Sequence, residues 1–184
     1  MKFFILLVLT TNLAFADDKG LEIAREVEAR DSGWGNFVAN MKMILTDRKG
    51  RSAVREIRTK NLEVDGDGDK SMSIFDTPRD IKGTAMLTFS HKLDMDDQWL
   101  YLPALKRVKR ISSRNKSGPF MGSEFAYEDL GSQEVEKYEY IYLGEDQLNG
   151  VSAFKSKRVP RYKHTGYKKQ IIWIDKDRYI PLRI

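Results

Sequence analysis

The sequence predicts an α+β fold, in which one amphipathic helix precedes about nine short strands of a large antiparallel sheet. Two observations support this prediction. Apolar residues recur at helical spacing near the start of the chain, whereas beyond Gly35 they alternate with polar residues at the period of a strand. Turn sequences such as Asp-Gly separate the alternating segments, as is typical of strands joined by hairpins.

Residues 1–16 have the three parts of a cleavable secretory signal. Lys2 supplies a positive charge, a short apolar run follows it, and Ala14-Phe15-Ala16 supplies the small residues that a signal peptidase requires. The apolar run is far shorter than the roughly 20 residues of a membrane-spanning helix. We therefore expect export, cleavage after Ala16 and a periplasmic mature protein, residues 17–184.

Composition narrows the chemistry of this mature chain. The sequence contains no Cys, which excludes thiolate nucleophiles and thiolate metal ligands. Its net charge of +5 arises from 32 Lys and Arg against 27 Asp and Glu, so the surface carries both signs. For an exported protein, a basic balance favours an anionic membrane surface over nucleic acid as the partner.

The helix is predicted over residues 17–31, where Leu21, Ala24 and Val27 share one face. The first two strands, 37–45 and 53–59, are joined by a turn. Further strands are predicted at 72–75, 81–93, 99–103, 108–111, 138–142, 151–155, 170–174 and 178–184, with a turn at 144–150. The chain stops within the last strand, so we expect a domain whose C-terminal strands are missing.

Three segments resemble the outer-membrane lipoprotein-sorting proteins of the LolA/LolB-like superfamily. They are Asp80–Ala85, Trp99–Ile111, and Gly118–Phe125 running into Tyr127–Leu130. The resemblance covers nearly the whole mature chain, although family members usually run longer. It implies an open, curved antiparallel half-barrel with helices across its mouth and an apolar cavity that takes acyl chains.

The resemblance also implies a function. Members are periplasmic proteins that shuttle lipid or lipoprotein between membranes, some of them beside inner-membrane transporters of the resistance-nodulation-division (RND) type. No catalytic residue, metal or cofactor carries over from the family. We therefore expect a non-enzymatic lipid or lipoprotein carrier. The alternative is an envelope-stress sensor or a transporter accessory module that uses the same fold to recognise a partner.

Apolar and aromatic residues of the predicted strands and loops are the candidate cargo contacts. Met is flexible and fills irregular space, while Tyr and Trp present an apolar body with a polar tip. An ordinary core would produce the same alternation, so the resemblance carries this assignment. The candidates are Met41, Met43, Met86, Trp99, Tyr101, Phe120, Met121, Phe125, Tyr138 and Tyr140.

The segment 112–131 permits two interpretations. A polar stretch precedes Phe120 and Met121, which Gly118 and Gly122 bracket. Glycines at such positions allow hinge motion, which predicts a lid that closes Phe120, Met121 and Phe125 over the cargo. The other interpretation is a loop whose apolar residues plug the sheet.

Two further motifs, a calcium-loop start and a Ser-His pair, only partly match their site patterns. Asp65, Asp67 and Asp69 match the start of a calcium loop, but Lys70 stands where Gly is needed, which favours a solvated hairpin turn. His91 has Ser90 close in sequence, but adjacent strand residues point to opposite faces and no Gly-x-Ser-x-Gly motif occurs.

Basic residues form two runs that fit either a solvated strand face or a contact with anionic headgroups. The first run contains Lys106, Arg107, Lys109, Arg110, Arg114 and Lys116, and the second contains Arg158, Arg161, Lys163, Lys168 and Lys169.

Overall fold

The computed structural model describes residues 14–184, so most of the predicted signal lies outside the described residues. Helix α1 spans Ala14–Arg30 and matches the predicted helix. The backbone N–H of Asp31 donates to the Val27 carbonyl, and the Ser32 hydroxyl donates to the Ala29 carbonyl, which together close its last turn. No helix in the described part of the chain is long and apolar enough to cross a membrane.

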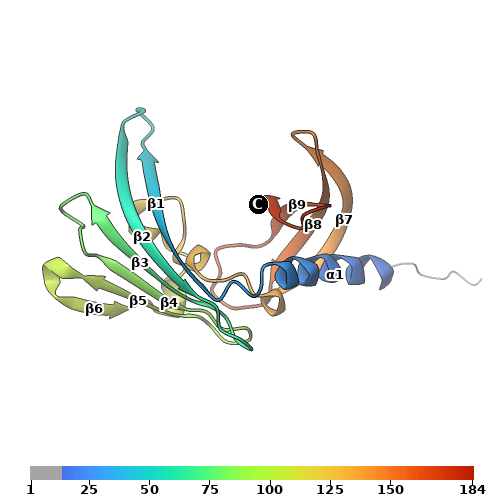
Figure 1. The fold of residues 1–184 in the computed structure, drawn as a ribbon, viewed down its shortest axis with the longest axis horizontal. Helices are drawn as coiled ribbons and strands as arrows, with labels where there is room; N and C mark the ends of the chain where they lie inside the picture. Colours follow the sequence, from blue (N-terminus) through green and yellow to red (C-terminus); the bar gives the residue numbers. More distant parts are fainter. Residues whose placement is uncertain (1–13) are drawn as a thin grey trace, which may run out of the picture.

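The strands form two antiparallel sheets, not the single large sheet that the sequence predicts. The first contains, in order, β1 (Asn36–Thr46), β2 (Ser52–Leu62), β3 (Lys70–Thr77), β4 (Ala85–Phe89), β5 (Asp97–Leu102) and β6 (Arg107–Arg110). The second contains β7 (Tyr138–Leu148), β8 (Val151–Pro160), β9 (Gln170–Asp175) and the short β10 (Pro181–Arg183). Figure 1 shows the two sheets as curved walls on either side of the connecting segment, with α1 at the foot of the second sheet.

Several predicted boundaries differ from the structure, and two of these differences involve glycine. The predicted strand 81–93 is reduced to β4, since residues 78–84 form a turn in which Gly83 has a φ of 81° and donates to the Phe75 carbonyl. The predicted turn 144–150 is mostly strand. Gly144, with a φ of 111°, lies at a register shift within β7, and the chain reverses only at Asn149-Gly150.

The six-stranded sheet buries one face, which we call its inner face. Cross-strand partners share a face, so the register Met41–Ile57–Phe75 and the pair Met86–Leu100 place all five residues on it. Segment 118–130 covers this face. It includes the short 3₁₀ turns η3 (Phe120–Gly122) and η4 (Tyr127–Leu130), and its Phe120, Met121, Tyr127 and Leu130 pack against the sheet core.

Helix α1 packs on the four-stranded sheet, chiefly along β7. Ile23 joins a buried cluster with Phe154, Ile172 and Ile174, while Ala24 packs with Val135 and two tyrosines of β7. Gly20 allows the close approach, because a Cβ there would lie only 3.0 Å from the Tyr142 nitrogen. The helix therefore lies against the second sheet and leaves the inner face of the first sheet to segment 118–130.

Candidate cargo cleft

A cleft of about 880 Å³ lies between the four-stranded sheet with α1 and the turn that joins β2 to β3. Its volume falls within the range of known ligand sites, which is roughly 300–1,000 Å³. Apolar residues from α1, from the turn η5 (Val135–Lys137), from the second sheet and from the C-terminal segment line it, together with charged residues. The apolar residues from α1, η5 and the sheet are Ala24, Val27, Val135, Tyr140, Ile172 and Ile174.

Acidic side chains also line the cleft, and two of them, Glu63 and Asp67, already form hydrogen bonds within the protein. Glu63 accepts hydrogen bonds from the backbone N–H groups of Gly33 (2.6 Å) and Gly35 (2.7 Å), which lower the pKa of its carboxyl group. This carboxylate therefore ties the segment after α1 to the end of β2.

His91 lies between two carboxylates beside the same cleft. Its Nδ1 is 2.8 Å from an oxygen of Asp67, and its Nε2 is 3.6 Å from an oxygen of Asp97. The hydrogen bond to Asp67 raises the imidazole pKa and lowers the pKa of Asp67 to about 2. The Ser90 hydroxyl accepts a hydrogen bond from the Ser132 backbone N–H, whereas the imidazole nitrogens face Asp67 and Asp97.

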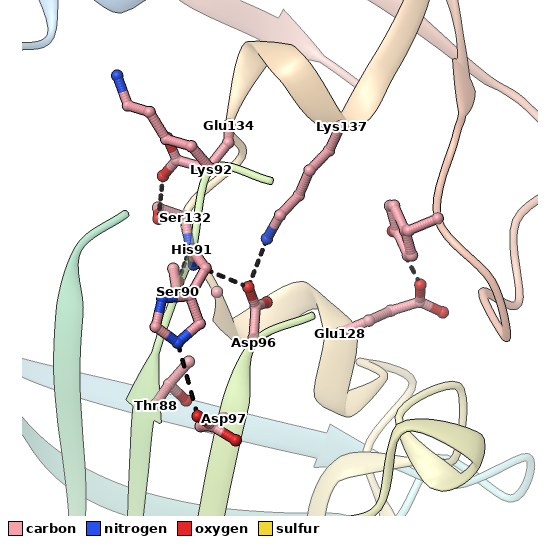
Figure 2. Close-up of polar contacts among 12 residues, drawn as sticks. Thr88, Ser90, His91, Lys92, Asp96, Asp97, Glu128, Ser132, Glu134 and Lys137 are labelled. Carbon is pink, nitrogen blue, oxygen red and sulfur yellow. Dashed lines mark hydrogen bonds and ion pairs between the residues drawn. The ribbon is translucent and has the colours of Figure 1, made fainter. Parts of the chain in front are cut away.

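A buried ion pair joins the two halves of the molecule beside this histidine. Figure 2 shows Asp96 between Lys137 and the backbone N–H of His91, which donates to the Asp96 carboxylate at 3.2 Å. Lys116 donates to the Asp96 backbone carbonyl, and burial lowers the pKa of this lysine. The adjacent cavity of about 20 Å³ has room for about one water molecule. This polar cluster holds the β4–β5 loop against the segment that leads into β7.

Only Tyr140 of the predicted cargo contacts lines the cleft. Met41, Met43 and Met86 lie on the inner face of the six-stranded sheet, where Met86 is buried and Met41 is 47% exposed. Trp99 pairs with Leu87 and Tyr101 with Ala85, which places both aromatics on the outer face. The strands therefore do not bring the methionines and these two aromatics to one surface.

The remaining predicted contacts divide between core and surface. Phe120 is 2% exposed and Met121 packs against the same core, whereas Phe125 is 57% exposed. Tyr138 is buried beside Tyr140 behind the cleft. The sequence analysis missed the lining residues Val27, Ile172 and Ile174, although the alternation of isoleucines in 170–174 was a usable signal for the last two.

The comparisons with known proteins agree with this fold. A family model described as "uncharacterized protein" matches residues 67–184. No curated protein matches the chain significantly. A solved structure described as a "putative outer membrane lipoprotein-sorting protein domain" from Vibrio parahaemolyticus is 59% identical, with a TM-score of 0.88 over 90% of this chain and 70% of that chain.

Two further solved structures are similar. A DUF1329 family protein from Desulfovibrio piger is 30% identical, with a TM-score of 0.84 over 91% of this chain and 71% of that chain. A LolA superfamily protein from Nitrosomonas europaea is 16% identical, with a TM-score of 0.63 over 90% and 69% of the two chains, and shows the fold alone. The chain belongs to the outer membrane lipoprotein-sorting protein family, with a LolA-like fold.

Proposed function

We propose that this protein is a non-enzymatic periplasmic carrier that binds acyl chains of a lipid or lipoprotein and moves them between membranes. The observation that carries the proposal is the 880 Å³ cleft with its apolar lining from α1 and the second sheet. The predicted secretory signal supports the periplasmic location. In this proposal, residues 17–184 are the lipid-binding domain.

The lining suits a flexible hydrocarbon chain. Each methylene group removed from water contributes about 0.8 kcal/mol, and this contribution does not depend on direction. A lining of aliphatic side chains therefore binds chains of varied structure without selecting one. On the inner face of the first sheet, Phe37 and Met41 are large apolar residues that remain exposed, which extends the available apolar surface.

The histidine cluster supports a carrier over a hydrolase. Both ring nitrogens of His91 face carboxylates, and the Ser90 hydroxyl accepts a hydrogen bond from the Ser132 backbone N–H. A nucleophilic serine needs a histidine nitrogen that can accept its proton. The observed contacts fit a structural role, in which His91 joins Asp67 to Asp97 beside the cleft.

A basic rim supports delivery to an anionic membrane surface. The turns at 47–51, 78–84 and 103–106 lie at one end of the six-stranded sheet, because consecutive strands are antiparallel. They expose six basic side chains and two acidic ones, and Leu105 is 67% exposed in the third turn. The basic residues are Arg48, Lys49, Arg51, Arg79, Lys82 and Lys106. Near an anionic bilayer each contributes about 1 kcal/mol.

Each of the two predicted basic runs has one buried member. Lys116 and Arg158 are buried, so they are unavailable to headgroups at the surface. The rim that we propose keeps Lys106 from the first run and adds basic residues of the other two turns.

The outer face of the six-stranded sheet favours the second candidate function, an accessory or sensor module. Val38 and Ile44 of β1, with Tyr101 and Val108 of β5 and β6, are exposed on this face. The two pairs lie at opposite edges of the sheet, and each leaves apolar surface available for contact with another protein. An inner-membrane RND-type transporter is the partner that this candidate implies.

One experiment separates the two candidates. The purified protein is extracted with organic solvent, the extract is analysed by mass spectrometry, and the delipidated protein is titrated with a fluorescent fatty acid. A carrier yields bound lipid and saturable probe binding. Protein that is empty and also ignores the probe refutes the carrier function.

A pair of substitutions locates the binding. Val27→Trp places an indole in the cleft, and we expect it to weaken probe binding at least about tenfold by removing volume that the chain needs. Val54→Trp makes the same change on the exposed outer face and is the control. Equal affinities of the two variants would show that the probe binds elsewhere.

A further inference from the structure

Arg158 is a buried cation in the lining of the cleft. It lies on β8 opposite Tyr140 and is 5% exposed. Its Nε donates to the Gln170 side-chain oxygen at 2.6 Å, and its Nη2 donates to the Gln133 side-chain oxygen at 2.8 Å. The guanidinium carbon also lies 4.3 Å from the centroid of the Tyr138 ring. These contacts fix the guanidinium in one orientation at the apolar wall.

None of these contacts supplies a negative charge. The glutamine oxygens are neutral, and burial raises the pKa of Tyr140 to about 12 and also raises that of Tyr138, so both phenols stay protonated. In the described part of the chain, no carboxylate oxygen lies within 4.0 Å of the Arg158 guanidinium. The positive charge is therefore buried without a counter-charge.

The charged groups near this region are compensated in different ways. Asp96 binds Lys137, and the buried Asp175 accepts from Arg178. Lys116, Glu128 and Glu134 are buried with neutral hydrogen-bond partners. A buried charge loses its hydration, which an opposite charge with good hydrogen bonds replaces best, whereas amide dipoles and an aromatic face compensate only in part. Arg158 is a buried cation of this second kind in the wall of the cleft, where a ligand can supply the counter-charge.

We propose that the cleft binds an anionic amphiphile, whose carboxylate or phosphate group pairs with Arg158 while its hydrocarbon chain lies against Val27, Ile172 and Ile174. The guanidinium fork suits both anions, because each presents two oxygens to two N–H donors. Acidic side chains also line the cleft, so the pairing with Arg158 must offset their repulsion of the bound anion. This inference rests on the carrier function and names the class of its cargo.

The test compares two probes of equal chain length, hexadecanoate and neutral hexadecanol, by displacement of a neutral fluorescent reporter. We expect wild-type protein to prefer hexadecanoate by about tenfold or more, since hydrogen bonds between charged groups are the strong ones. Arg158→Gln abolishes this preference and changes hexadecanol affinity less than about twofold. Arg30→Gln is the matched control. Arg30 lines the same cleft but already binds Glu26 and the Asp177 carbonyl, so its loss leaves the preference intact.

Two further measurements are needed. A comparison of two phosphates identifies the source of the anion, and a melting temperature tests whether the arginine has only a structural role. Hexadecyl phosphate should behave like hexadecanoate, whereas inorganic phosphate alone should compete poorly. Equal binding of the two phosphates would assign the site to a free anion and overturn the proposal. The melting temperature of ligand-free Arg158→Gln should equal or exceed that of wild type, because an uncompensated charge is removed. A large fall, with both probes weakened equally, would show that the arginine is only structural.

The outcomes separate this inference from the carrier function. Wild-type protein that binds hexadecanoate and hexadecanol equally overturns the assignment of an anionic cargo and leaves the carrier function standing. Wild-type protein that binds neither probe overturns both. Arg158→Lys keeps the charge but loses the fork, and we expect it to retain a reduced preference for hexadecanoate.

Discussion

Replacement of Phe120 by Ala decides between the two interpretations of segment 112–131. The Phe120 ring is 2% exposed and lies in the core of the six-stranded sheet, 5.8 Å from the Phe75 ring and 5.6 Å from the Tyr127 ring between centroids. Truncation of a buried Phe costs about 3–5 kcal/mol, which includes the cavity and the lost aromatic contacts. We therefore expect Phe120→Ala to lower the free energy of unfolding by about that amount.

The assay is urea unfolding monitored by tryptophan fluorescence, with probe binding measured in parallel. Phe125→Ala removes the same ring from the same segment, but Phe125 is 57% exposed, so its expected effect is within about 0.5 kcal/mol. A loss below about 1 kcal/mol for Phe120→Ala, together with weaker probe binding, would refute the core assignment and restore the lid. Stability loss with unchanged probe affinity confirms that the segment plugs the sheet.

Two further predictions concern charge. The His91–Asp67 pair stabilises the fold fully between pH 3.8 and 6.5, the ordinary pKa values of the two groups. Above pH 6.5 this stabilisation is lost as the pH rises through the raised pKa of the imidazole. Below pH 3.8 it is lost as the pH falls towards about 2, the lowered pKa of Asp67. The difference in melting temperature between wild type and His91→Gln should therefore be largest inside that window, and a constant difference would contradict the pairing. For the basic rim, replacing Lys49 and Lys106 by Glu should reduce sedimentation with vesicles containing phosphatidylglycerol, whereas the same change at Lys168-Lys169 should not; equal losses would exclude a specific rim.

The secondary structure was predictable because the spacing of apolar residues differs between a helix and a strand. The helical spacing of Leu21, Ala24 and Val27 and the alternation in 37–45 identify α1 and β1. Glycine misled the prediction where its role depends on the partner strand. Gly144 produces a bulge within β7, whereas Gly150 produces the reversal, and both look alike in sequence.

The candidate site was less predictable because a strand pattern shows that two faces differ but not where each face points. Alternation placed Met86 and Trp99 in one group of apolar residues. The register then puts Met86 inside and Trp99 outside, since Met86 pairs with Leu100 and Trp99 with Leu87. Long-range pairing fixes this choice, and a single sequence carries no direct record of it.

Arg158 is a charged residue whose burial the sequence pattern also did not predict. In sequence it belongs to a run of basic residues, which suggested a solvated or membrane-facing surface. On β8 it shares the face of Phe154 and Ser156, against which α1 packs, so the fold buries a charge that composition assigns to the surface. Burial of a charge without a direct ion pair is costly. In a cleft lined by aliphatic side chains, an anionic head group on a hydrocarbon chain supplies both the missing charge and the contacts for the surrounding wall.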